Sequence, residues 1–187
     1  MFEQLTDLIK SHSGNAIVNN NAIPNEKNNE AIGLASSSVI SGIQQAISSG
    51  NLKDILSLFS GKQDVAQNPV TQNIQGSFID KLKSQFGLDN TQATGAASGL
   101  IPDVLKNLVQ KTNDPGNSQF DLQSILNQVT GGKTSGLNMQ SLLDKYKSGA
   151  FDMDGDGDTD LQDVMAMLKG NGKEGGGLMD TVKGFFK

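Results

Sequence analysis

The chain has 187 residues and a formal net charge of −5, and it contains neither cysteine nor tryptophan. The missing cysteines exclude disulfides, thiol catalysis and cysteine-ligated zinc. There is also no arginine and no basic patch with interleaved aromatic side chains, which argues against nucleic-acid binding. Because aromatic residues make up only 5% of the chain, we expect helices packed through Ala, Gly, Ser, Ile and Leu instead of large rings.

The first ten residues have an amphipathic helical pattern, with apolar side chains at Phe2, Leu5, Leu8 and Ile9. They carry acids and lack the basic start and apolar run of a signal peptide, so we expect a cytoplasmic protein. No stretch approaches the roughly 18 apolar residues of a transmembrane helix. The single histidine, His12, has no second histidine or nucleophile motif to work with, so we expect it at an exposed helix end.

Helical periodicity dominates the rest of the chain, and no segment alternates like a strand. After a polar connection over 13–29, the predicted helices span 30–48, 52–60, 69–86, 91–111, 121–130, 139–147, 161–169 and 176–186. The pattern predicts an all-α, multihelical array. We divide it into a helical repeat domain at 1–135, a calcium-binding segment at 136–170 and a tail at 171–187.

Two internal repeats support this division. The longer one pairs Ala31–Ser36 with Ala93–Ser98, and both copies read Ala-x-Gly-x-Ala-Ser before an apolar helix and a short helix. The small residues would permit close helix–helix approach, and two such halves would pack around a pseudo-twofold axis. The shorter repeat is a helix that begins with an N-cap residue at Asn51, Asp121, Asn138 or Asp160 and ends at Gly61, Gly131, Gly149 or Gly170. We interpret its first three copies as a capped packing unit.

The fourth copy overlaps an acidic segment with the pattern of an EF-hand-like calcium loop. Aspartates occupy positions 1, 3, 5, 7, 9 and 12 of twelve residues, namely Asp152, Asp154, Asp156, Asp158, Asp160 and Asp163. Gly157 falls at position 6, where the loop turns sharply. Outside this segment 15 lysines face 14 acids, so the negative charge of the protein is concentrated here.

Calcium takes six to eight hard oxygen ligands, which carboxylates on alternate residues of a tight turn can supply. Asp152, Asp154 and Asp156 would bind through their side chains and Asp158 through its backbone carbonyl. Asp160 would bind directly or through water, and Asp163 would complete the shell. The alternative is a solvated acidic turn without a metal.

Three departures from the EF-hand pattern qualify the assignment. Position 12 is Asp163 instead of Glu, which admits Mg2+ more readily, and position 8 is Thr159 instead of Ile or Val. Gly149 should end the incoming helix before the loop. The loop therefore resembles those of dockerin modules as much as a full EF-hand, although a paired second loop is missing.

The two-copy arrangement resembles the YidB-like family of bacterial proteins, a domain of unknown function. The shared features are the Ala31–Ser36 and Ala93–Ser98 segments, Ile101-Pro102 with its following helix, short helices ending in Gly, and the Gly-rich tail from Gly175 to Phe186. The resemblance covers 30–132 and the tail. It implies an all-helical fold without catalytic residues, to which the calcium loop would be an addition.

The tail has an apolar stripe at Leu178, Met179, Val182, Phe185 and Phe186 behind a glycine hinge. We expect this stripe to dock onto the core of the protein itself, with a partner groove or a membrane surface as the alternative. One hypothesis is a calcium-binding, non-enzymatic protein in which the ion orders the C-terminal segment. The other is a calcium-responsive module that presents this helix to a protein partner, a second copy or a membrane surface. A hydrolase is disfavoured, because an oxygen-saturated loop leaves little open coordination and no base is evident nearby.

Overall fold

The computed structural model describes residues 2–114, 116–117, 120–132, 134–136 and 138–149, and these form helices and connections without any strand. The helices are α1 (Phe2–His12), α2 (Asn28–Ser48), α3 (Leu52–Ser60), α4 (Pro69–Phe86), α5 (Asn90–Thr112), α6 (Leu122–Val129) and α7 (Met139–Ser148). The all-α fold is therefore confirmed, and within these residues each predicted helix is present with ends close to those expected. The connection over 13–29 is more ordered than expected, since it contains a π-turn at Gly14–Val18 and buries Ile17 and Ile23.

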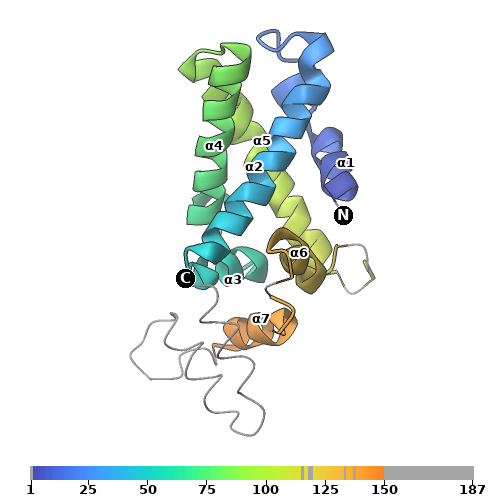
Figure 1. Cartoon of the computed structure of the whole chain (residues 1–187), viewed down its shortest axis with the longest axis vertical. Helices are drawn as coiled ribbons and strands as arrows, with labels where there is room; N and C mark the ends of the chain where they lie inside the picture. The colour runs from blue at the N-terminus through green and yellow to red at the C-terminus, as the bar shows by residue number, and fades with distance from the viewer. Residues whose placement is uncertain (1, 115, 118–119, 133, 137, 150–187) are drawn as a thin grey trace, which may run out of the picture.

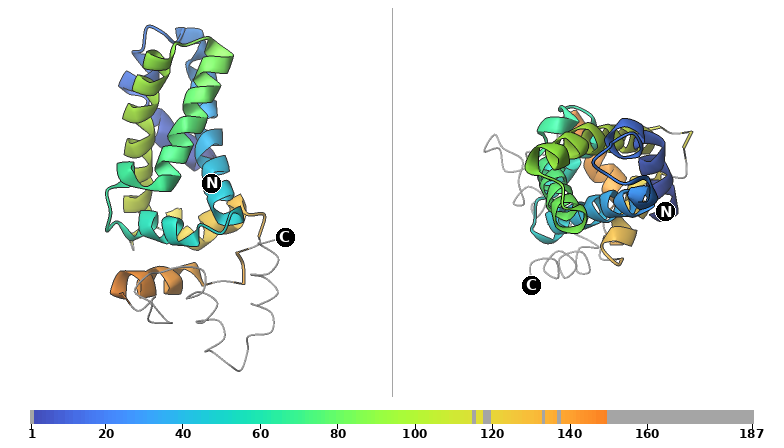
Figure 2. Two further views of the ribbon diagram at one scale, coloured as in Figure 1. Left: turned by 90° about the vertical axis from the view of Figure 1, so that its left-hand side faces the viewer. Right: turned by 90° about the horizontal axis from the view of Figure 1, so that it is seen from above.

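Four helices surround the core. The long helices α2, α4 and α5 run side by side, and α1 and α4 each contact both α2 and α5 (Figure 1). Seen from above, the four helices form a ring (right panel of Figure 2). The shorter α1 fills the fourth position of this ring and closes one side of the bundle.

The short helices α3 and α6 lie across one end of the bundle, and α7 packs beneath them through contacts with both (Figure 2). The largest fully buried side chains include Phe59 of α3 and Phe78 and Leu82 of α4. Each such side chain stabilises the fold by about 1.5–3 kcal/mol relative to an exposed position. The crosswise helices are therefore part of the same apolar core as the bundle.

Local side-chain hydrogen bonds fix where the long helices begin and end. The Asn68 carboxamide oxygen accepts a hydrogen bond from Val70 N at 2.9 Å, with Pro69 in the first helical position of α4. Asp89 and Gln92 form a reciprocal capping box at the start of α5. Gly87 ends α4 with a φ of 68°, which is favourable for glycine alone.

Two of the three described copies of the short repeat have the predicted N-cap bond. Asp121 accepts a hydrogen bond from Ser124 N at 2.8 Å, and Asn138 accepts one from Ser141 N at 2.9 Å. Asn51 has no side-chain cap bond, so the prediction is wrong for this copy. Its ψ of 46° differs from the extended ψ of the two residues that do cap. The fourth copy, from Asp160 to Gly170, lies outside the described residues.

The long repeat packs through its alanines. Ala31, Ala35, Ala93 and Ala97 are fully buried. In contrast, Gly33 and Gly95 face open space, so these glycines do not provide the close helix approach that the motif suggested. That approach occurs at Gly42, outside the motif, where α4 comes against α2. The pseudo-twofold relation between the two halves stays a prediction.

Candidate functional site

The predicted metal ligands Asp152, Asp154, Asp156, Asp158, Asp160 and Asp163 lie outside the described residues, as does the apolar stripe from Leu178 to Phe186. Among the residues that the structure does describe, no group of three or more His, Cys, Asp or Glu side chains could hold a metal ion. The described element nearest to these residues in the chain is α7, so the candidate site is taken as α7 and its contacts with the body.

Helix α7 ends where the sequence predicted. Gly149 is its C-cap, with a φ of 75°, and its backbone N–H bonds to the carbonyl groups of Lys145 and Tyr146. A left-handed glycine closes a helix at little cost. Gly149 stands three residues before Asp152 in the sequence, so the helix end predicted before the acidic segment is present.

The side chain of Gln123, on α6, holds the start of α7. Its amide nitrogen donates to Thr134 O at 3.0 Å, and its amide oxygen accepts from Met139 N at 2.9 Å. The N–H of Met139 is one of the first four in the helix and has no intrahelical partner, so Gln123 satisfies an otherwise orphaned donor. The buried side chains of Met139, Leu142 and Leu143 complete the contact of α7 with the body.

Three side chains, Lys62, Asn113 and Lys147, hold the other end of α7, and we call them the helix-end junction. The Lys62 ammonium donates to the backbone carbonyl of Lys147, in the last turn of α7. The Lys147 ammonium donates to Asn113 Oδ1 at 2.5 Å. These contacts tie the end of α7 to residues that follow α3 and α5.

Asn113 connects the junction to two further helix ends. Its Nδ2 atom lies 2.8 Å from both Phe59 O, in the last turn of α3, and Val109 O, in the last turn of α5. The last carbonyls of a helix lack intrahelical donors and carry the negative end of the helix dipole. The junction therefore places side-chain donors on carbonyl groups at the C-terminal ends of α3, α5 and α7. Of these, Val109 O also accepts from the backbone N–H of Asn113.

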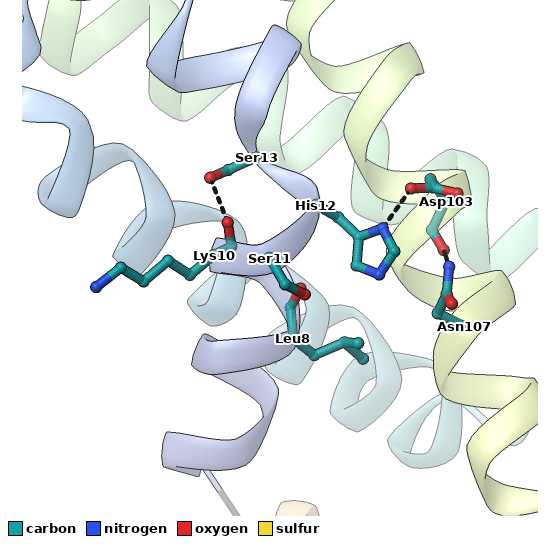
Figure 3. A network of polar contacts seen from close by, with 7 residues as sticks. All are labelled: Leu8, Lys10, Ser11, His12, Ser13, Asp103 and Asn107. Atoms are coloured by element: carbon teal, nitrogen blue, oxygen red, sulfur yellow. Dashed lines mark hydrogen bonds and ion pairs between the residues drawn. The ribbon is translucent and has the colours of Figure 1, made fainter.

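His12 lies at the end of α1, as predicted, but its side chain is only partly exposed, and it has a partner that the sequence did not indicate. Its Nδ1 atom is 2.7 Å from Asp103 Oδ2 of α5, and 26% of the His12 side chain is exposed (Figure 3). The neighbouring hydroxyl groups of Ser11 and Ser13 donate to backbone carbonyls of their own helix. The pair therefore joins α1 to α5, and neither serine is poised as a nucleophile.

A cleft of about 520 Å3 runs between α5 and the α3–α4 connection. Its lining includes Gln63, Asp64, Pro102, Asp103 and Lys106. Asp64 already accepts a hydrogen bond from Ala66 N, and Asp103 is paired with His12, so its carboxylates have local partners. The charged residues of the lining are mixed in sign, with Lys106 beside the two carboxylates, so the cleft does not favour a cation or an anion by charge alone.

Two lysines outside this region have shifted pKa values. Partial burial lowers the pKa of Lys81 on α4, whose ammonium donates to Ser37 Oγ of α2 at 3.1 Å. The hydrogen bond to Glu30, followed by its negative charge, raises the pKa of Lys27. Both groups make contacts at helix surfaces, so their shifts reflect local packing and pairing.

Comparisons with protein families, with curated proteins and with solved structures return no match for this chain. None of the described helices is long and apolar enough to cross a membrane.

Proposed function

We propose that this is a calcium-binding, non-enzymatic helical protein in which the ion orders the C-terminal segment. The observation that carries the proposal is the spacing of six aspartates over Asp152–Asp163 around Gly157. Oxygen donors at positions 1, 3, 5, 7, 9 and 12, with glycine at position 6, are the set that a calcium loop requires. Six unpaired carboxylates in twelve residues would repel one another, and a divalent cation relieves that repulsion.

The attachment of α7 supports the structural part of the proposal. This helix ends three residues before the loop and is held at its start by Gln123 and at its end by Lys62. If an ion held the loop in one conformation, the ordered chain that includes α7 would continue towards residue 170. Ion binding would therefore stabilise the segment that follows α7.

The direct test is isothermal titration of chelator-treated full-length protein with calcium, repeated in millimolar magnesium. We expect one site with a dissociation constant within the range of about 10⁻⁷ to 10⁻³ M known for such loops. Because Asp163 stands at position 12 in place of Glu, we expect magnesium to compete measurably.

Matched variants identify the ligands. Asp152→Asn and Asp156→Asn each remove one proposed ligand and should abolish or strongly weaken binding. Asp144→Asn removes the same charge from α7, outside the loop, and should leave the affinity nearly unchanged. Absence of calcium binding by the unaltered protein in both buffers would overturn the proposal and leave Asp152–Asp163 as an acidic turn.

A further inference from the structure

The cleft between α5 and the α3–α4 connection carries polar groups that the fold leaves unused. Among the described residues, none bonds to the Lys106 ammonium or to the Gln110 carboxamide, and both residues are exposed. Gln63 accepts a hydrogen bond from Ser57 Oγ at 2.6 Å through its Oε1 atom, and its Nε2 donors have no partner in the same part of the chain. Free polar groups beside apolar surface are what small-molecule sites use to orient a ligand.

Charges of opposite sign follow one another along the α5 wall of this cleft. Asp103 and Lys106 both line it and are three residues apart, so their Cβ atoms lie about 5–6 Å from each other. Asp103 Oδ2 lies 2.7 Å from His12 Nδ1. On the facing wall, Asp64 uses its Oδ1 atom to accept a hydrogen bond from Ala66 N at 3.0 Å. Each carboxylate therefore keeps a second oxygen for a ligand.

The space between the two walls suits a small ligand. Its volume is about 520 Å3, within the range of about 300–1,000 Å3 that is usual for ligand pockets. The connection begins close to α5, since a Cβ atom added at Gly61 would lie 3.9 Å from Val109 Cγ1. At Gly99, which also lines the cleft, an added Cβ atom would meet nothing within 4 Å, so the cleft is open there.

We propose that this cleft binds a zwitterionic ligand of dipeptide size. The ammonium group of the ligand contacts Asp64 and Asp103, and its carboxylate contacts Lys106. A purely cationic ligand would face the lysine and a purely anionic one the two aspartates, whereas a zwitterion places an opposite charge against each. Two extended residues span at most about 7 Å, which is close to the spacing of Asp103 and Lys106 along α5. This binding goes beyond the proposed function and needs no calcium.

The test is titration of isotope-labelled full-length protein with alanylalanine in a buffer that contains a chelator, followed by the chemical shifts of the backbone amides. The amides of Gly61 and Gly99 should shift, whereas that of Gly33, on α2 and outside the cleft, should not. N-acetylation or C-terminal amidation of the dipeptide removes one of its charges. Each modification should weaken binding about two- to fivefold, the range for exposed ion pairs.

Charge variants assign each end of the ligand to its partner. Lys106→Met should bind alanylalanine and its amide equally, because the carboxylate has lost its contact. Asp64→Asn should reduce the difference between alanylalanine and its N-acetyl form, while the Asn side chain can still accept from Ala66 N. Lys53→Met is the control, because it removes an exposed lysine of α3 that does not line the cleft and should leave all four affinities unchanged.

A matched pair of glycine variants tests the location without changing any charge. Gly99→Leu fills the opening of the cleft and should abolish binding. Gly95→Leu lies one turn earlier on α5, where an added side chain also meets open space, and should bind normally. Leucine favours a helix over glycine, so both variants should stay folded.

Four outcomes would overturn the proposal. These are no binding of alanylalanine at millimolar concentration, equal binding of the dipeptide and both blocked forms, undiminished binding by Gly99→Leu, and an affinity for free alanine equal to that for the dipeptide. None of them bears on calcium binding, which is measured in a separate titration.

Discussion

Ile74 of α4 lies directly against the backbone of α2 at Gly42. A Cβ atom added at Gly42 would fall 2.2 Å from Cγ1 of Ile74 and 3.1 Å from its Cδ1. Ile74 is fully buried, so its side chain has no free space to move into. The absence of a side chain at residue 42 therefore allows α2 and α4 to pack at this distance.

Gly42→Ala should destabilise the protein by about 2–3 kcal/mol, because overpacking of a dense core forces side chains or helices to shift. Gly33→Ala, on the same helix and facing open space, is the control. It should stabilise the protein by about 0.5–1 kcal/mol, since alanine favours the helix over glycine. Urea unfolding followed by circular dichroism measures both changes, and equal effects would contradict the packing argument.

Ile74→Ala should rescue part of the cost of Gly42→Ala. The substitution removes Cγ1 and Cδ1, the two atoms closest to the added methyl group. Ile74→Ala alone should cost about 2–5 kcal/mol because it leaves a cavity. The loss of unfolding free energy in the double variant should be smaller, by at least about 1 kcal/mol, than the sum of the losses in the two single variants. If the losses simply add, the two residues do not contact.

The N-caps of the short repeat should differ in their contribution to stability. Asp121→Ala and Asn138→Ala each remove a hydrogen bond to a backbone N–H group and should cost about 1 kcal/mol. Asn51→Ala removes a side chain without such a bond and should cost only a few tenths of a kcal/mol. Unfolding free energies of the three variants check this order, and an equal cost for Asn51 would show that it also caps its helix.

Thr71→Val should be neutral or should stabilise the protein by up to about 1 kcal/mol. The Thr71 hydroxyl is buried in α4 and has no hydrogen-bond partner among the described residues, so it carries a desolvation cost without compensation. Thr130→Val is the control, because its buried hydroxyl donates to Leu126 O at 2.7 Å. Thr130→Val should lower the free energy of unfolding, measured with denaturant, by about 1 kcal/mol. A larger loss for Thr71→Val than for Thr130→Val would contradict the absence of a hydrogen bond at Thr71.

Calcium removal should lower thermal stability if the ion orders the C-terminal segment. A ligand at one hundred times its dissociation constant stabilises the folded state by about 2.7 kcal/mol. For a chain of this size that corresponds to a rise in Tm of roughly 5–10 °C if unfolding is cooperative. Calorimetry in calcium and in chelator measures the shift, Asp152→Asn should abolish it, and equal Tm values for the unaltered protein would rule out the coupling.

The helices and most of their ends follow from local patterns in the sequence. Periodic apolar residues mark the buried faces, and the predicted caps at Asp121 and Asn138 act on backbone groups three residues further on. Such local interactions can be read without knowing the fold. The proposed calcium loop likewise rests on a local pattern, since all its proposed ligands fall within twelve residues.

Contacts across the bundle could not be read from the sequence. His12 pairs with Asp103, which is 91 residues away, and Asn113 bonds to Phe59 across 54 residues. Gly42 carries the close approach that the sequence assigned to the small-residue motifs, because helix contact depends on how the ring of α1, α2, α4 and α5 closes. The spacing of apolar residues along the chain shows which face of each helix is buried. Which helix packs against that face depends on how all the helices fill the core together.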